Sequence, residues 1–184
     1  MSGGEVEYWQ GYEENGEVAG RVTTDEAARG ALHGSAHVWI WRRKGNVLEV
    51  MLQRRSAKKR TWPNLWDISA AGHPAYGESM LEGAIRETYE EIGVALSREQ
   101  LELLFVYRAH MVSLQPKTIE NELQFVYGVE LHGDHTLKLQ EDEVESVQWV
   151  TLETLEKMCA MRDTLVPHDD AYFIQLFAQL RRYL

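Results

Sequence analysis

The chain has 184 residues, a formal net charge of −10, a sequence pI near 5.2 and 44% hydrophobic residues. This length favours one domain with an adequate core, and the hydrophobic content excludes a disordered chain. The acidic balance argues against general binding to nucleic acids or anionic membranes, and no apolar run approaches the ~20 residues of a membrane span.

The targeting and redox signals are weak in this sequence. Its first ten residues, MSGGEVEYWQ, lack the basic-then-apolar pattern of a secretory signal. The single cysteine, Cys159, excludes an intrachain disulfide, and its apolar neighbours indicate a core position. We therefore expect a cytoplasmic protein, either a monomer or a homodimer.

In chain order, the first predicted elements are hairpins. Residues 6–22 predict two strands around an Asn15-Gly16 turn. Residues 23–31 predict a short helix with a threonine or aspartate cap. Residues 37–55 predict a second hairpin that turns at Lys44-Gly45-Asn46.

The second half of the chain alternates strands with helices. Two long strands and a shorter one are predicted at 101–114, 120–131 and 143–150, followed by helices at 151–161 and 170–184. This interleaving indicates an α/β fold in which a mixed, largely hairpin-built sheet lies between helical layers.

Residues 72–94, GHPAYGESMLEGAIRETYEEIGV, contain an amphipathic helix pattern. Apolar spacings of three, four and seven define its buried stripe, with Gly93 as a natural stop. Thr88 lies in this stripe, so its hydroxyl needs a nearby hydrogen-bond acceptor. The stripe consists of Leu81, Ala84, Ile85, Thr88 and Ile92.

Three glutamates project together from another face of this helix. Glu87, Glu90 and Glu91 stand at i, i+3 and i+4, where like charges repel by roughly 0.2–0.5 kcal/mol per pair. One interpretation is a solvated acidic face. The other is a site for a hard divalent cation, because Mg²⁺ takes oxygen ligands from carboxylates and substrate phosphates.

Read with its glycines, the segment resembles the Nudix box. The matching pattern is Gly72, five residues, Glu78, seven residues, Arg86-Glu87, two residues, Glu90-Glu91, one residue, then Gly93 and an aliphatic residue. The resemblance implies a Nudix-type α/β/α sandwich, with residues 1–184 as a single Nudix hydrolase domain and the box at 72–94. It also implies Mg²⁺- or Mn²⁺-dependent hydrolysis of a diphosphate linkage in a small molecule.

The resemblance assigns roles within the box. Glu87, Glu90 and Glu91 would be metal ligands, joined by the backbone carbonyl of Gly72, and Glu90 and Glu91 would also be catalytic. Glu78 and Arg86 would form a structural ion pair that pins the loop to the helix. The chemistry agrees, since phosphoryl transfer needs neutralised phosphate oxygens and an activated water.

Flanking segments extend the resemblance to isopentenyl-diphosphate isomerase and the Nudix hydrolases similar to it. This branch implies that Glu122 ligates a metal or acts as general base, and that His73 contacts the metal or substrate. Isomerases also hold a metal with two histidines that precede the box. This chain has His33 at one of these positions and Glu26 near the other. The segments are ALHGSAHVWIW at 31–41, QRRSAKKRTWPNLWD at 53–67, ENE at 120–122 and LQEDEVESVQWV at 139–150.

Isomerase activity itself is disfavoured by one position. The isomerase chemistry uses a cysteine just before Gly-His-Pro, and this chain has Ala71 there. An alanine cannot relay a proton. The sequence therefore favours a hydrolase of nucleotide-type or isoprenoid diphosphates, with an isomerase or a non-catalytic ligand-binding module as alternatives.

The segment RRSAKKR, residues 54–60, is a basic cluster in an acidic chain. It predicts either a solvated loop or a diphosphate clamp. The resemblance implies that Arg55 and Lys59 would bind the phosphates, with Arg55 exposed. Arg54 alternates to the opposite strand face. His33 and His37 would share one face if their strand begins early.

Overall fold

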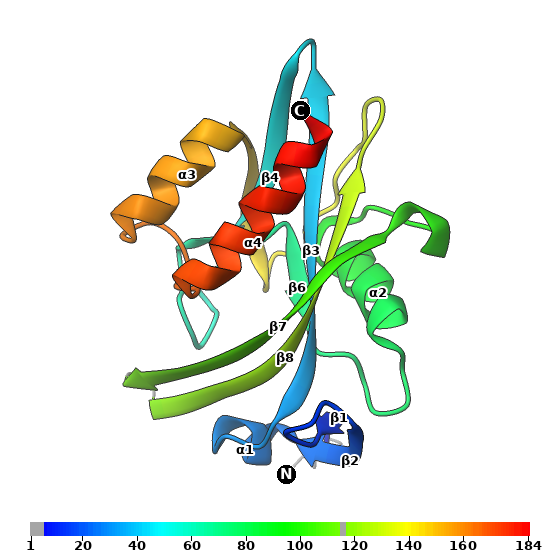
Figure 1. Cartoon of the computed structure of the whole chain (residues 1–184), viewed down its shortest axis with the longest axis vertical. Helices are drawn as coiled ribbons and strands as arrows, with labels where there is room; N and C mark the ends of the chain where they lie inside the picture. The colour runs from blue at the N-terminus through cyan, green and yellow to red at the C-terminus, as the bar shows by residue number, and fades with distance from the viewer. Residues whose placement is uncertain (1–5, 115–116) are drawn as a thin grey trace.

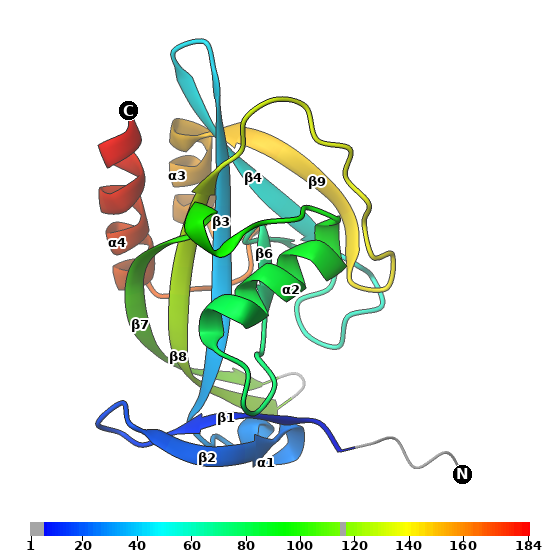
Figure 2. The same ribbon diagram turned by 90° about the vertical axis from the view of Figure 1, so that its right-hand side faces the viewer.

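The computed structural model describes residues 6–114 and 117–184. A nine-stranded sheet runs through the molecule, with helix α2 on one side and helices α3 and α4 on the other (Figures 1 and 2). The strands are β1 (Tyr8–Tyr12), β2 (Val18–Thr23), β3 (His33–Lys44), β4 (Val47–Arg55), β5 (Trp66–Asp67), β6 (Ala70–Gly72), β7 (Glu102–Leu114), β8 (Lys117–Glu130) and β9 (Val144–Thr151). The helices are α1 (Thr24–Ala28), α2 (Met80–Ile92), α3 (Leu152–Met161) and α4 (Asp170–Leu180), with 3₁₀ turns η1 (Arg98–Gln100) and η2 (Arg181–Tyr183).

The sheet is mixed and largely built from hairpins, which confirms the predicted fold class. The hairpins β1–β2, β3–β4 and β7–β8 are antiparallel, while β3 and β8 pair in parallel from His33 opposite Glu122 to Trp41 opposite Glu130. Strand β3 also pairs with β6, and β4 with β9. Strand β3 therefore lies at the centre of the sheet, beside several of the strands that carry the other site residues.

Alternation along β3 creates the two packed layers. Trp39 and Trp41 belong to the cluster that packs against α3 and α4, whereas Val38 and Ile40 belong to the cluster with α2. Successive side chains on a strand point to opposite faces, so one strand contributes to both cores. His33, Ser35 and His37 continue the Trp39 face toward the start of β3, and His37 still contacts Tyr172 of α4.

The local predictions are confirmed at most turns and caps. Gly16 and Gly45 adopt positive φ in the first two hairpin turns, and Gly93 ends α2 with φ of 76°. Thr23 caps α1 through a reciprocal capping box with Glu26. Thr88 is fully buried, and its Oγ1 donates to the Ala84 carbonyl at 2.7 Å, which supplies the acceptor it needs.

The short strands β5 and β6 were not predicted, because two or three residues are too few to show a periodic pattern. Cys159 is half-buried beside the α3–α4 core, and burial raises the pKa of its thiol to about 12. Across residues 6–114 and 117–184, none of the helices combines the length and apolar character needed to cross a bilayer.

Candidate active site

A pocket of about 750 Å³ is lined by residues of β3, β6, β8 and α2. Carboxylates from α2 and β8 line it together with the basic loop after β4 and the segment before α4. Most of the predicted site residues thus share one cavity, although they are spread over almost seventy positions. The lining includes Arg55, Lys59, Gly72, His73, Arg86, Glu87, Glu90, Glu91, Glu120 and Glu122.

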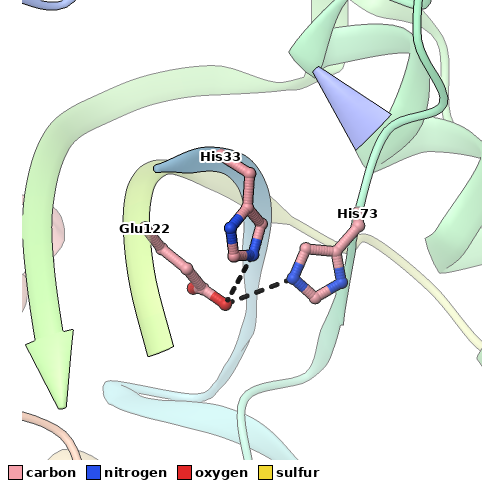
Figure 3. A group of neighbouring side chains, drawn as sticks. All are labelled: His33, His73 and Glu122. Carbon is pink, nitrogen blue, oxygen red and sulfur yellow. Dashed lines mark hydrogen bonds and ion pairs between the residues drawn. The ribbon is translucent and has the colours of Figure 1, made fainter. Parts of the chain in front are cut away.

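One group of potential metal-binding side chains lies where β3 pairs with β8, beside the pocket. Ligand atoms of His33, His73 and Glu122 all lie within 4.8 Å of one another (Figure 3). Oε1 of Glu122 is 3.2 Å from Nε2 of His73 and 3.7 Å from Nε2 of His33. The parallel register places His33 directly opposite Glu122, and the segment after β6 brings in His73.

Hydrogen bonds orient these three side chains for coordination. Oε2 of Glu122 accepts from Ser35 Oγ at 2.8 Å and from Gln124 Nε2 at 3.0 Å, which leaves Oε1 facing the histidines. Nδ1 of His33 lies 2.8 Å from the Ala31 carbonyl and donates to it, which turns Nε2 of His33 toward Oε1 of Glu122.

Electrostatics and packing reinforce this arrangement. Burial alone would raise the pKa of Glu122, but the two imidazoles outweigh it and hold that pKa well below its usual value. The His73 ring stacks on Trp9, with centroids 3.9 Å apart. The donor set of two imidazole nitrogens and a carboxylate oxygen fits a divalent transition metal.

Glu26 lies outside this group. Its carboxylate accepts hydrogen bonds from the backbone and hydroxyl of Thr23 in the α1 capping box, and it is exposed. The approximate match of Glu26 to a metal-binding histidine is therefore wrong. The capping-box spacing of threonine and glutamate was the signal for its actual role.

The three α2 glutamates have different environments. Glu91 is only 6% exposed, and its Oε2 accepts from Gln53 Nε2 and from the Ala71 amide, both at 3.1 Å. Burial raises the pKa of Glu91 to about 8 and also raises the pKa of Glu87. Glu90 is exposed, so the exposure of the three carboxylates increases from Glu91 in the core, through Glu87, to Glu90 in solvent.

Gly72 lies against the carboxylates. A Cβ at this position would overlap the carboxyl group of Glu87, so only glycine allows the close approach of β6 to α2. The cradle that results, with a backbone segment beside ionisable oxygens, fits an oxygen-liganded divalent cation.

Arg86 occupies the base of the acidic face. Its Nε and Nη2 form two hydrogen bonds with Glu78, at 3.0 and 2.9 Å, and its Nη1 contacts Glu87 at 2.8 Å and Glu90 at 3.1 Å. The Arg86 guanidinium thus links the loop before α2 to the helix, and its positive charge offsets the repulsion among the carboxylates.

The basic loop is paired with acidic partners. Arg55 is 16% exposed at its side chain, donates to Asp67 Oδ2 at 2.9 Å and also contacts the Thr61 carbonyl. The expectation of an exposed Arg55 is therefore wrong. Lys59 forms an ion pair with Glu143.

Further pairs surround the same loop. Lys58 forms an ion pair with Asp142, and Arg54 pairs with Glu145 at 3.6 Å on the opposite strand face, as its alternation predicted. Two lysines of the loop are thus held by the segment that follows Gln140, whose own amide donates to the Glu91 carbonyl.

Sequence reasoning missed the inner end of the pocket. His37, Asp67 and His168 line it, and Tyr172 of α4 lies behind them. Burial alone would raise the pKa of Asp67, but His168 and Arg55 hold it at about 2. Asp67 and His168 show no local pattern, because their partners come from distant segments.

The comparisons with known proteins agree with this geometry. The family model for the NUDIX domain matches residues 31–177. The chain therefore belongs to the Nudix hydrolase family, whose members act on pyrophosphate-containing substrates.

The curated relatives include both Nudix hydrolases and isopentenyl-diphosphate isomerases. The chain is 37% identical over 144 residues to Nudix hydrolase 3 of Arabidopsis thaliana, a match that spans 76% of this chain but 18% of the plant protein. It is 32% identical to an uncharacterised Nudix hydrolase of Listeria monocytogenes, over 83% of this chain and 85% of that protein. It is 35% identical to isopentenyl-diphosphate Δ-isomerase of Citrobacter koseri, over 67% of this chain and 65% of the isomerase.

Solved structures support the fold. The Deinococcus radiodurans protein DR0079 superposes with a TM-score of 0.70 at 23% identity, over 92% of this chain and 98% of that one. A MutT protein of Methanosarcina mazei superposes with a TM-score of 0.60 at 25% identity, over 84% and 96%. The α/β/α arrangement is thus the Nudix fold.

Proposed function

We propose that the chain catalyses divalent-metal-dependent hydrolysis of a diphosphate linkage in a nucleotide-type or isoprenoid diphosphate. The observation that carries this proposal is the convergence of the α2 carboxylates, His73, Glu122 and Arg55 on one pocket, with His33 directly beside His73 and Glu122. Mg²⁺ or Mn²⁺ bound there would neutralise phosphate oxygens and make a water nucleophilic at neutral pH.

The site side chains would have two roles, metal binding and acceptance of the proton from water. Glu87, Glu90 and Glu91, with the Gly72 carbonyl, would hold one cation, and His33, His73 and Glu122 are placed to hold a second. In the reaction a water oxygen bonds to phosphorus, the bridging P–O bond breaks and the phosphate leaves. The proton of that water passes to a carboxylate, for which Glu122, Glu90 and Glu91 are the candidates.

The basic side chains would bind the substrate. Arg55 already points along the pocket wall from its pair with Asp67, and a phosphate would share its guanidinium fork. Lys59 would exchange Glu143 for a phosphate oxygen. These contacts do not distinguish a nucleotide from an isoprenoid leaving group.

The relatives bear on the substrate to different degrees. The NUDIX domain of Shewanella oneidensis NrtR was solved with ADP-ribose, and it superposes with a TM-score of 0.58 at 16% identity over 84% of this chain and 88% of that one. That likeness supports the fold alone. The isomerase relatives act on isopentenyl diphosphate, as their name states.

The test is a metal-dependent phosphate-release screen over a panel of nucleotide-type and isoprenoid diphosphates. Wild-type protein should release phosphate from at least one member with Mg²⁺ or Mn²⁺, and chelation should stop it. Glu90→Gln should lower turnover by orders of magnitude with the fold intact, whereas Glu13→Gln, in an exposed turn, should not. Normal activity in Glu90→Gln would remove the metal assignment.

Isomerisation is the second candidate, because of the 35%-identical isomerases. The pocket contains Ala71, whose methyl group replaces the isomerase thiol and whose amide is bonded to Glu91. NMR of the protein incubated with isopentenyl diphosphate should therefore show no dimethylallyl diphosphate. Double-bond migration would overturn the hydrolase proposal, and silence in both assays with tight ligand binding would favour a binding module.

A further inference from the structure

His37 is a buried polar side chain on the pocket floor that the reaction described above does not use. It is 5% exposed, and it follows His33 and Ser35 on the same face of β3. Ser35 bonds to Glu122 on one side of it. On the other side, the His168 ring lies 5.7 Å away, and Nε2 of His168 lies 3.8 Å from Asp67, the partner of Arg55.

A chain of hydrogen bonds determines which nitrogen of His37 bears the proton. Trp39 Nε1 donates to the Tyr172 hydroxyl oxygen at 2.9 Å, because an indole N–H can only donate. The Tyr172 hydroxyl lies 3.0 Å from Nδ1 of His37 and has one proton to give. Nδ1 therefore accepts, and the ring proton resides on Nε2.

The ring is also kept neutral. Burial lowers the pKa of His37 to about 4, and the nearby His168 also lowers it, whereas Glu122 and Asp67 act in the opposite direction. Among the described residues, none makes a hydrogen bond to Nε2 of His37, and the side chain lines the pocket. Nε2 of His37 is not fully enclosed by protein atoms, so its N–H is open to an acceptor on a ligand in the pocket.

We propose that His37 is a substrate-binding residue whose Nε2–H donates a hydrogen bond to a non-bridging oxygen of the diphosphate. This inference rests on the proposed function. His37 lies between the His33–His73–Glu122 group and the Arg55–Asp67 pair, so a diphosphate that reaches from one to the other passes over it. Ionised phosphate oxygens only accept hydrogen bonds, which matches the donor that the Tyr172 contact enforces.

A neutral donor suits this position for a physical reason. The pocket is lined by several carboxylates and by five basic side chains, those of Arg55, Lys58, Lys59, Arg60 and Arg86, and its metal sites would add further charge. A protonated histidine there would repel bound cations, whereas a neutral N–H orients the phosphate without changing the net charge. His37 would thus contribute binding geometry rather than proton transfer.

The test measures binding of methylenediphosphonate, a diphosphate analogue without a cleavable P–O–P bridge, by calorimetry in the presence of Mg²⁺. His37→Leu should weaken binding by about tenfold to a hundredfold, the effect of losing a hydrogen bond to a charged group. His37→Gln should recover most of the affinity, because its amide nitrogen can stand near the Nε2 position. The control is His132→Gln, whose parent side chain is 81% exposed on the loop after β8.

A second measurement uses the wild-type protein, so it does not depend on folding of the variants. In ¹⁵N-labelled protein, the Nε2–H signal of His37 should shift when methylenediphosphonate binds. Equal affinity for wild type and His37→Leu, or heat of binding with an unmoved His37 signal, would overturn the inference while the proposed function stands. Absence of any binding to wild type with Mg²⁺ or Mn²⁺ would overturn both.

Discussion

Glu91→Gln should stabilise the protein in the presence of a chelator and remove its response to metal. Glu91 is a buried carboxyl that receives two hydrogen bonds, from Gln53 and from the Ala71 amide, both at 3.1 Å. These bonds are too few to offset the loss of water, so burial raises its pKa to about 8. Glutamine keeps the shape and the acceptor oxygen but cannot ionise.

The magnitude follows from linkage between protonation and folding. Because the pKa of Glu91 is higher in the folded state, its unfavourable effect is absent below pH 4.5 and grows as pH rises toward about 8. At pH 7 the difference of about 2.5 pH units from the unfolded value corresponds to about 3 kcal/mol. Imperfect bonding of the new amide offsets part of this, so we expect a net gain of about 1–3 kcal/mol.

Thermal unfolding in EDTA and in MgCl₂ measures this effect. For a chain of this size each kcal/mol shifts Tm by about 2–4 °C, so Glu91→Gln should melt several degrees above wild type in EDTA at pH 7. The difference should shrink toward pH 5, and Mg²⁺ should raise the Tm of wild type and of Glu13→Gln but not that of Glu91→Gln. Glu13→Gln, in an exposed turn, is the matched control.

Two results would refute the reasoning. If Glu91→Gln melted below wild type in EDTA, the ionised carboxylate would be structural rather than strained. If the difference were the same at pH 5 and pH 7, burial would not control the ionisation of Glu91.

Three further predictions concern other parts of the fold. Gly72→Ala should weaken Mg²⁺ binding at least about tenfold, because the new methyl displaces Glu87; unchanged affinity in a calorimetric titration would place the cation elsewhere. Arg55→Ala should lower kcat/KM by about 10–100-fold and also lower stability by about 3 kcal/mol, because Asp67 loses its buried partner; a fall in Tm with normal kinetics would leave only a structural role. Cys159 should react with iodoacetamide at pH 8 at least about tenfold more slowly than in urea, since burial raises its pKa to about 12.

The sequence by itself determined the features that depend on near neighbours. Gly93 ends α2 because a left-handed residue is needed within one turn of the helix. Glu87, Glu90 and Glu91 share a region of the surface because helix geometry alone places i, i+3 and i+4 together. The Arg86 contacts to Glu78 and Glu87 likewise span at most eight positions. Patterns of this range can be read without knowing the fold.

The core layers were predictable for a similar reason. Alternation along β3 and the 3.6-residue period of α2 indicate which side chains face inward. The order of strands was less accessible, because the parallel pairing of β3 with β8 joins segments about ninety residues apart. The interleaving of strands and helices predicted a mixed sheet, but it did not predict which strands pair in parallel.

The tertiary structure decided which of the candidate groups meet. Contacts between distant segments bring His73 to Glu122 and give Arg55 its partner Asp67. The hydrogen bond between Tyr172 and His37 spans 135 positions, and the helix predicted at 170–184 gave no indication of it. Burial also separated Glu91 from Glu90, although the two are adjacent in sequence. Ionisation, tautomer and pairing depend on the water that packing excludes, and that is a property of the assembled fold.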